Sequence, residues 1–405
     1  MLEFFTSNTV LLISLSLGIC FLTLFLLPRI RENSLKLGFY DMPDHRSSHT
    51  KIVPTFGGIA FYISLLFTLF LVQKYDINNV GLTLLVSISI VFFTGLKDDL
   101  QNLSPRMKFL GQIIAVSVLM IQSDFRIVSF HGFLGLYELP TIISILLSMF
   151  FILSLINAYN LIDGIDGMAS IVGIVIASSY GFIFYKLNML LYLAICMSIM
   201  SMLFAFLRFN FSPRKKIFMG DTGALVIGLT LGLLTLKLLS LGADAFQVLA
   251  VDRSEIPLLI LGILFIPIFD ILRVMLIRLS RGKPVFSPDR NHIHHILIDA
   301  GLSHRKASVL AGLGNICIVL IMFYSIREFG IIASFFVLLF FTTSFLLMFF
   351  GMNRSYASKR RKVKLRNGLF FISRMLLNSR KKGSNATAHK LAFNQKLKKI
   401  RILFF

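Results

Sequence analysis

Apolar runs of about 20 residues recur along this chain from one end to the other, and they constrain its fold more than any other feature. A helix needs about 20 residues to cross the hydrocarbon core of a bilayer, where every backbone polar group must find its partner within the protein. Soluble domains rarely combine 56% hydrophobic residues with only 15% charged ones. We therefore predict an all-α, polytopic integral membrane protein.

Hydropathy and length predict about eleven transmembrane helices. They cover residues 10–27, 55–72, 80–96, 109–121, 140–156, 168–185, 188–207, 222–240, 256–277, 307–326 and 331–350. No basic residue precedes the first run, so we expect it to be retained as a span rather than cleaved as a signal peptide. Residues 1–351 then form a multi-span membrane domain, and residues 352–405 form a basic cytoplasmic tail that suits an anionic lipid surface.

The distribution of Lys and Arg indicates how the chain crosses the membrane. The loops after the first, third, seventh and ninth predicted spans are basic, as is the tail, whereas the alternate loops contain little beyond Lys74, Arg126, Lys186, Arg253 and Arg327. The positive-inside rule places the basic loops and the C-terminus in the cytoplasm and the N-terminus outside. Because these segments also account for the net charge of +22, we expect membrane lipids, and no nucleic acid, as partners.

The dense polar clusters all fall on the predicted cytoplasmic side, at residues 41–49, 98–108, 157–166, 221 and 289–295. A transport path would instead place ionisable residues through the interiors of the spans. Only Lys237, Asp270 and Arg273 interrupt the apolar segments, and each is near enough to an end for its side chain to reach the membrane surface. One site at the membrane surface is therefore favoured over a path through the membrane.

The stretch Asn157 to Gly167 reads NAYNLIDGIDG and concentrates polar chemistry between two apolar runs. Asn157, Asn160, Asp163 and Asp166 recur every three residues, so on a helix continuing from the fifth span they would lie roughly on one face. Such a strip suits ribose, base or Mg²⁺-bound water. A plain capped loop is the alternative, although it would not need both amides and both acids.

Two further carboxylate motifs stand at the ends of predicted spans. Asp98 and Asp99 are adjacent, so one can meet a cation or substrate while the other orients it or takes a proton. Asp221 follows Gly220 at the start of the eighth span, where it is either an N-cap or a ligand of phosphate-bound Mg²⁺. Solvated capping carboxylates are the alternative for both motifs.

Histidine and cationic residues complete the set. His292, His294 and His295 follow Arg290 in a spacing that is not a standard zinc pattern, so pyrophosphate binding is favoured over zinc or a solvated loop. Arg46 and His49 belong to a basic, proline-containing loop that enters the second span, and Lys108 could bind a lipid phosphate or only reach the interface.

Taken together, these motifs resemble the polyprenyl-phosphate N-acetylaminosugar-1-phosphate transferase family, glycosyltransferase family 4, and most closely its undecaprenyl-phosphate GlcNAc-1-phosphate transferase branch. The resemblance runs from about residue 41 to residue 295. It implies Mg²⁺-dependent transfer, with Mn²⁺ as an alternative ion, of an N-acetylaminosugar 1-phosphate from a UDP-sugar to undecaprenyl phosphate, with release of UMP. It further implies the bacterial inner (cytoplasmic) membrane and the start of lipid-linked surface polysaccharide synthesis, and leaves open whether the protein is a homodimer.

The resemblance also implies a role for each motif residue. The catalytic residues would be Asp98, Asp99, Asp163 and His292, and the metal ligands would be Asp221, Asp98 and Asp99. The nucleotide sugar and its phosphates would meet Asn157, Asn160, Asp163, Asp166, Arg290, His292, His294 and His295. The lipid phosphate would meet Lys108, Arg46 and His49.

Two features of the sequence bear on the branch of the family. Ser47 and Ser48 stand between Arg46 and His49, where many members of the family have Arg-Lys before the His. This chain therefore lacks that lysine and whatever function it has in those members. The HIHH motif resembles the GlcNAc branch more than the run of three histidines in the peptidoglycan phospho-N-acetylmuramoyl-pentapeptide transferase. That transferase is the alternative enzyme, and a lipid-linked sugar transporter is the alternative from another class.

Overall fold

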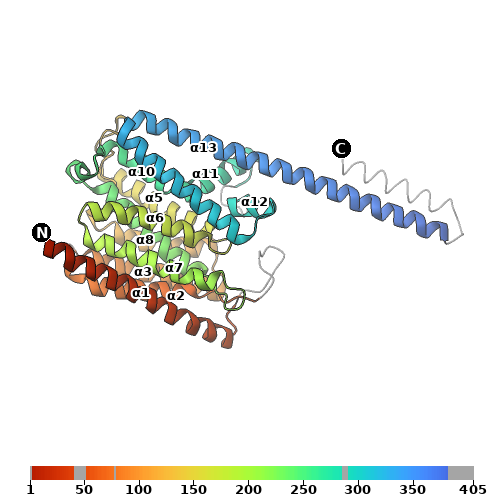
Figure 1. The fold of residues 1–405 in the computed structure, drawn as a ribbon, viewed down its shortest axis with the longest axis horizontal. Helices are drawn as coiled ribbons and strands as arrows, with labels where there is room; N and C mark the ends of the chain where they lie inside the picture. The colour runs from red at the N-terminus through yellow and green to blue at the C-terminus, as the bar shows by residue number, and fades with distance from the viewer. Residues whose placement is uncertain (1, 41–51, 77–78, 285–290, 382–405) are drawn as a thin grey trace. The chain divides into compact units, whose positions relative to one another are not determined.

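The computed structural model describes residues 2–40, 52–76, 79–284 and 291–381. Within these ranges the chain is helical and holds no strand, apart from an isolated β-bridge between Ser129 and Glu138 (Figure 1). The chain divides into two compact units, residues 1–349 and 350–405.

The helices are α1 (Leu2–Lys36), α2 (Gly57–Val72), α3 (Val80–Gln101), α4 (Pro105–Leu119), α5 (Thr141–Ile162), α6 (Met168–Lys186), α7 (Leu190–Asn210), α8 (Gly220–Ser240), α9 (Ala243–Phe246), α10 (Ile256–Ile263), α11 (Phe265–Ser280), α12 (Ile293–Asp299) and α13 (His304–Lys381).

Among the described residues, eight helices are long and apolar enough to cross a membrane, and a ninth span results if α10 and α11 are counted as one segment with a 74° bend. Each run predicted as a span is helical, which confirms an all-α polytopic membrane protein. The fourth predicted span corresponds to α4, which is only 15 residues long. The number of eleven membrane crossings therefore remains a prediction.

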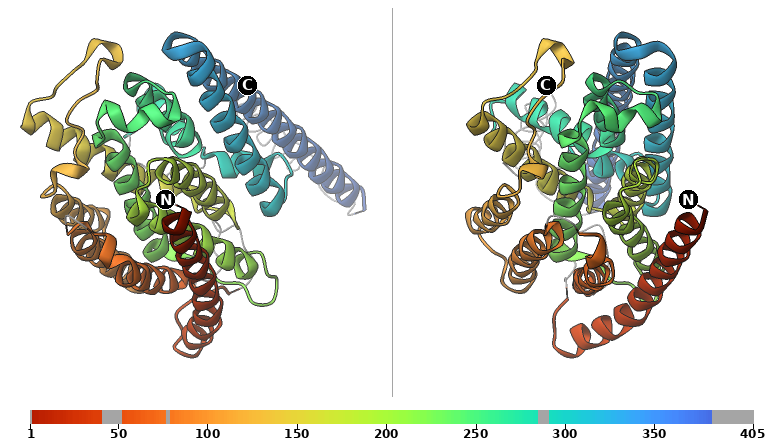
Figure 2. Two further views of the ribbon diagram at one scale, coloured as in Figure 1. Left: turned by 60° about the vertical axis from the view of Figure 1, so that its left-hand side comes forward. Right: turned by 90° about the vertical axis from the view of Figure 1, so that its left-hand side faces the viewer.

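The long helix α13 folds back on itself within the first unit. Gly330 has a non-helical backbone conformation, with φ 75° and ψ −170°. The Ser334 hydroxyl donates to the Ser325 hydroxyl over 3.0 Å, and a Cβ on Gly314 would lie 3.7 Å from the ring of Phe345. A straight helix would separate residues 314 and 345 by about 46 Å at 1.5 Å per residue. The predicted segments 307–326 and 331–350 are therefore two antiparallel arms, and Figure 2 shows the reversal.

Helix α8 is the centre of the bundle, and α2, α3, α5 and α6 pack around it (Figure 1). Every residue from Thr222 to Leu239 is buried. A helix that is apolar on all sides lies either in a protein core or in lipid, and the complete burial of these residues places α8 in the core of the bundle. The polar residues at the start of α8 are therefore held in place by neighbouring helix ends.

Glycines let two neighbours approach the start of α8 at backbone distance. A Cβ on Gly58 of α2 would lie 2.2 Å from the backbone nitrogen of Gly223, and one on Gly95 of α3 would lie 2.6 Å from the Cα of Thr222. Small residues permit such close helix packing in membranes, where van der Waals contact is a main source of association. As a result, the last turns of α3 lie directly against the start of α8.

We expect Gly95→Leu to prevent correct assembly of the bundle, because the new side chain would overlap the backbone of α8. The matched control is Gly18→Leu on α1, an exposed position where a Cβ would meet nothing within 4 Å. The measurement is the yield of monodisperse protein after extraction in mild detergent. Equal yields for the two variants would contradict the close α3–α8 contact.

Candidate active site

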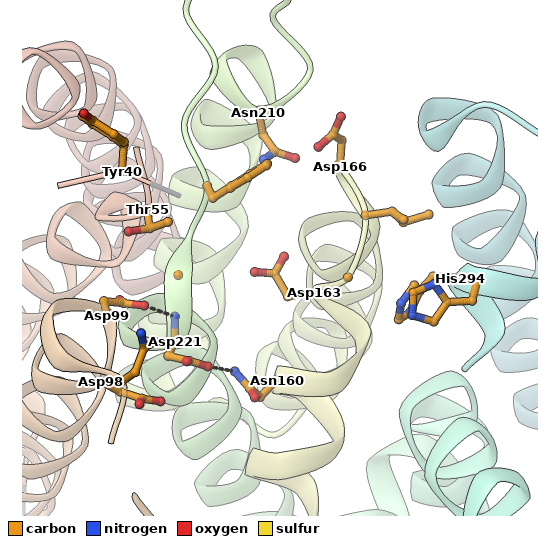
Figure 3. A pocket seen from close by; sticks show the side chains of 16 residues that line it. Tyr40, Thr55, Asp98, Asp99, Asn160, Asp163, Asp166, Asn210, Asp221 and His294 are labelled. Carbon is orange, nitrogen blue, oxygen red and sulfur yellow. Dashed lines mark hydrogen bonds between the residues drawn. The ribbon is translucent and has the colours of Figure 1, made fainter. Parts of the chain in front are cut away.

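A cavity of about 560 Å³ collects residues from separate motifs at one end of the bundle (Figure 3). The predicted residues that line it are Asp98, Asp99, Asn160, Asp163, Asp166, Asp221, His294 and His295. They come from α3, α5 with the turn after it, α8 and α12. Segments almost 200 residues apart in the sequence, on the order of half the chain, thus converge on one space.

Other predicted site residues either do not line the cavity or lie outside the described residues. Asn157 faces α4, where its amide nitrogen donates to Gln112 Oε1 over 2.8 Å, and it does not line the cavity. His292 is 4% exposed and lies behind the residues of the cavity wall. Arg46, His49 and Arg290 lie outside the described residues.

Lys108, in the first turn of α4, joins two of the carboxylates. Its ammonium nitrogen lies 2.9 Å from Asp98 Oδ2 and 2.7 Å from Asp221 Oδ1. Asn160 also donates from its amide nitrogen to Asp221 Oδ1, at 2.5 Å (Figure 3). The second oxygen of Asp98 accepts from the backbone N–H of Leu103 over 2.7 Å. A cation is therefore already present where the two carboxylates converge.

Asp99 has a different role from its neighbour, because it caps α8. Its Oδ1 accepts from the backbone N–H of Asp221 over 2.9 Å. Its Oδ2 accepts from the backbone N–H and the hydroxyl of Thr222, at 3.0 and 2.5 Å. The first N–H groups of a helix have no partner within the helix, so a side-chain acceptor there stabilises its start. Asp99 thereby fixes the backbone that carries Asp221.

Asp163 directly follows α5 and points into the cavity between Asp221 and His294 (Figure 3). Burial raises the pKa of its carboxyl well above the ordinary value, and the nearby charges of Asp221, Asp166 and Asp99 raise it further. Either protonation of Asp163 or the binding of a cation would relieve this repulsion. The cavity therefore carries an excess of negative charge that favours cation binding.

Asp166 connects three segments at the cavity edge. Its Oδ2 lies 2.6 Å from Lys216 Nζ, in the α7–α8 loop, and 3.2 Å from His304 Nδ1, at the start of α13. Its backbone carbonyl accepts from the Ser308 hydroxyl over 2.6 Å. Burial alone would raise the pKa of Asp166, but the hydrogen bonds from His304 and Lys216 lower it overall. Asp166 is thus a fixed anion that holds the loops together.

His294 and His295 contribute imidazoles on α12. His294 is 5% exposed and packs on Gly164 so closely that a Cβ there would lie 2.3 Å from Nε2. Burial, and then the neighbouring His295, lower the pKa of His294 to about 3. Its ring is consequently neutral at physiological pH, able to accept or donate a hydrogen bond but not to provide a positive charge.

Sequence reasoning missed several residues that line the cavity, namely Tyr40, Thr55, Asn102, Asn210 and Phe218. Asn210 is the most informative: its Oδ1 accepts from the Gly167 N–H over 2.6 Å, and its Nδ2 donates to the Ile217 carbonyl over 3.0 Å. The available signal was an amide at the C-terminal end of the apolar run of α7. The others adjoin loops and carry no distinctive pattern.

Comparison with known proteins gives consistent matches. The family described as "Glycosyl transferase family 4" matches residues 81–239. A protein of Bacillus subtilis (strain 168), named probable undecaprenyl-phosphate N-acetylglucosaminyl 1-phosphate transferase, is 32% identical over 290 residues, which cover 70% of this chain and 76% of that protein.

Two relatives from other bacteria carry related names. The undecaprenyl-phosphate alpha-N-acetylglucosaminyl 1-phosphate transferase of Yersinia pestis is 27% identical, over 72% of this chain and 78% of its own length. The decaprenyl-phosphate N-acetylglucosaminephosphotransferase of Mycobacterium tuberculosis (strain ATCC 25618 / H37Rv) is 30% identical, over 71% of this chain and 76% of its own. The named polyprenyl chain thus differs among relatives, whereas N-acetylglucosamine is common to the three names.

We expect Lys216→Met to lower the free energy of unfolding by about 1 kcal/mol, because it removes a partly buried partner of Asp166. Lys215→Met, at an exposed neighbouring position, is the control. The measurement is the midpoint of thermal unfolding in detergent at pH 7. Since the pKa of Asp166 is lowered in the folded protein, the stabilisation is present at neutral pH and disappears as the pH falls through that lowered value. Equal midpoints would show that the pair contributes nothing.

Proposed function

The chain belongs to glycosyl transferase family 4, and we propose that it transfers N-acetylglucosamine 1-phosphate from UDP-N-acetylglucosamine to undecaprenyl phosphate, with release of UMP. The observation that carries the proposal is the convergence of Asp98, Asp163 and Asp221 on one polar cavity beside Lys108. The relatives' names supply the polyprenyl phosphate acceptor and the N-acetylglucosamine group.

A polyprenyl phosphate has an anionic head group at the membrane surface, and a nucleotide sugar arrives from water. A site for both must lie where helix ends and loops meet the interface, and the proposal is supported by the position of this cavity among helix ends and loops. The basic loops support a cytoplasmic position for the site, in the inner membrane of a bacterium. The product would be the lipid-linked sugar that starts the synthesis of a surface polysaccharide, such as an O-antigen of lipopolysaccharide or a cell wall polymer.

In the overall reaction, an oxygen of the lipid phosphate forms a bond to the β-phosphorus of the donor. The bond between that phosphorus and the bridging oxygen breaks, and the bridging oxygen leaves with UMP. We propose that Lys108 binds the lipid phosphate and that Asp98, which lies 2.9 Å from the Lys108 ammonium, takes the proton of that phosphate. His294 lies across the cavity from Asp98 and Asp221 (Figure 3), and its neighbour His295 also lines the cavity. We propose that these two histidines contact the donor pyrophosphate.

The residues present also fit Mg²⁺. Asp98, Asp163 and Asp221 offer the carboxylate oxygens that Mg²⁺ prefers. Burial, and then the charges of Asp221, Asp166 and Asp99, raise the pKa of Asp163, and a bound cation would offset both effects. The described residues hold no ready-made group of three acidic, histidine or cysteine ligands, and Lys108 bridges two of the carboxylates instead. We propose Asp221 as the principal ligand and Asp98 as its partner, while Asp99 supports the site by capping α8. A bound Mg²⁺ would neutralise phosphate charge during transfer.

The proposal is tested by UMP release from membranes that contain the protein, given undecaprenyl phosphate and Mg²⁺ with UDP-N-acetylglucosamine, UDP-N-acetylgalactosamine or UDP-MurNAc-pentapeptide in separate reactions. We expect release with UDP-N-acetylglucosamine. Release with the pentapeptide donor alone would support the peptidoglycan transferase instead. No release with any donor, from folded protein, would overturn the assignment as a sugar-phosphate transferase of these substrates.

We expect Asp221→Ala to lower UMP release by at least about 100-fold, because it removes the carboxylate that meets both Lys108 and Asn160. Chelation with EDTA should abolish release by the wild-type protein, and added Mg²⁺ should restore it. Asp124→Asn, which alters an ion pair with Lys237 in the last turn of α8, at the opposite end of that helix from Asp221, is the control and should retain activity. A Mg²⁺ titration unchanged by Asp221→Ala would remove Asp221 from the metal site.

A further inference from the structure

The proposed reaction uses His294 and His295 but leaves their neighbour His292 without a role. His292 is 4% exposed, and its Nδ1 lies 2.9 Å from Oδ2 of Asp270 on α11. Asp270 and Arg273 were expected to reach the membrane surface, and that expectation is wrong: they are 1% and 5% exposed. The sequence shows both as charges near a helix end, whereas the fold closes α12 and its preceding residues over them.

Helix α11 holds the start of α12 through both charged residues. The second oxygen of Asp270, Oδ1, accepts from the backbone N–H of Ile293 over 2.8 Å. Arg273 lies 3.6 Å from the same oxygen and donates to the backbone carbonyl of Asn291. Three successive residues, Asn291, His292 and Ile293, are therefore bound to one turn of α11.

These contacts fix the orientation of the His292 ring. A buried carboxylate is stable only when its oxygens are hydrogen-bonded and its charge is compensated. Asp270 accepts, so Nδ1 of His292 must donate, and Nε2 is left on the opposite side of the ring. The N–H of Ile293, at the first position of α12, is one of the helix-start donors that need an outside acceptor. Asp270 thus determines both the orientation of His292 and the point where α12 begins.

Ring contacts connect His292 with His294 and His295, which line the cavity. The rings of His292 and His294 are nearly parallel, with an angle of 4° and centroids 5.9 Å apart. The centroid of His295 lies 4.1 Å from that of His294. Helix α12 has only seven residues, so its start determines where these two rings lie. A shift at Asp270 would therefore move the histidines that line the cavity while leaving the carboxylates of α3 and α8 in place.

We infer that Asp270 is a positioning residue for the nucleotide sugar: through His292 and the start of α12, it places His294 and His295 against the donor pyrophosphate. This inference rests on the proposed function and goes beyond it, because neither the acceptor side nor the carboxylate cluster is involved. It predicts that loss of the Asp270 carboxylate raises the KM for the nucleotide sugar and not the KM for the lipid phosphate. A general loss of stability would not affect one substrate selectively.

The test is the steady-state kinetics of Asp270→Asn, which keeps the size of the side chain and removes its charge and one acceptor. We expect the KM for UDP-N-acetylglucosamine to rise at least about 10-fold and the KM for undecaprenyl phosphate to stay within about 2-fold of wild type. Asp124→Asn is the matched control, a carboxylate-to-amide change at another ion pair, and should change neither KM. Where Asp270→Asn does not fold, His292→Asn alone must show the same selective rise.

A double-mutant comparison tests the route of the effect. If Asp270 acts through His292, adding Asp270→Asn to His292→Asn should change the donor KM by less than about 2-fold. The inference is overturned if the effects of the two substitutions on the donor KM multiply, or if both KM values rise equally. Either result would leave the proposed function intact, because the wild-type protein would still be active. A wild-type protein that releases no UMP would instead overturn the proposed function and this inference with it.

Discussion

The arrangement of the site depends on one requirement: the first N–H groups of α8 have no acceptor within the helix and need acceptors from elsewhere in the protein. Asp99 supplies them, from a helix that must therefore end beside the start of α8. An unpaired backbone group in an apolar surrounding costs several kcal/mol, on the order of the whole stability of a domain. The close approach at Gly95 makes the contact sterically possible. Asp98, Lys108 and Asn160 then follow as neighbours of Asp221.

Much of this organisation was predictable from the sequence, because hydrocarbon imposes simple rules. Apolar runs predicted the helices, and carboxylates beside apolar runs predicted where polar chemistry would gather. Asp98, Asp163 and Asp221, from three separate motifs, converge on one cavity, whereas the position of that cavity at the membrane surface remains a prediction. The family resemblance agrees with the relatives found by comparison.

Other details depend on three-dimensional packing and could not be read from spacing. A repeat of three residues drifts by about 60° per step around a helix with 3.6 residues per turn, so the polar strip beginning at Asn157 does not share one face. Asn157 turns to Gln112, while Asp163 and Asp166 lie beyond the end of α5. The pairing of Asp270 with His292 joins residues 22 positions apart, through a contact that no local pattern announces.

The complete burial of α8 has a consequence for the membrane around the protein. Outer helices must adjust their tilt when the thickness of the bilayer differs from the length of their apolar surface. Helix α8 presents no such surface, since its neighbours enclose it from Thr222 to Leu239. The helix that carries Asp221 is therefore insulated from the lipid, and the geometry at its start is set by protein contacts alone. A change of bilayer thickness would therefore act on Asp221 only through the helices around α8.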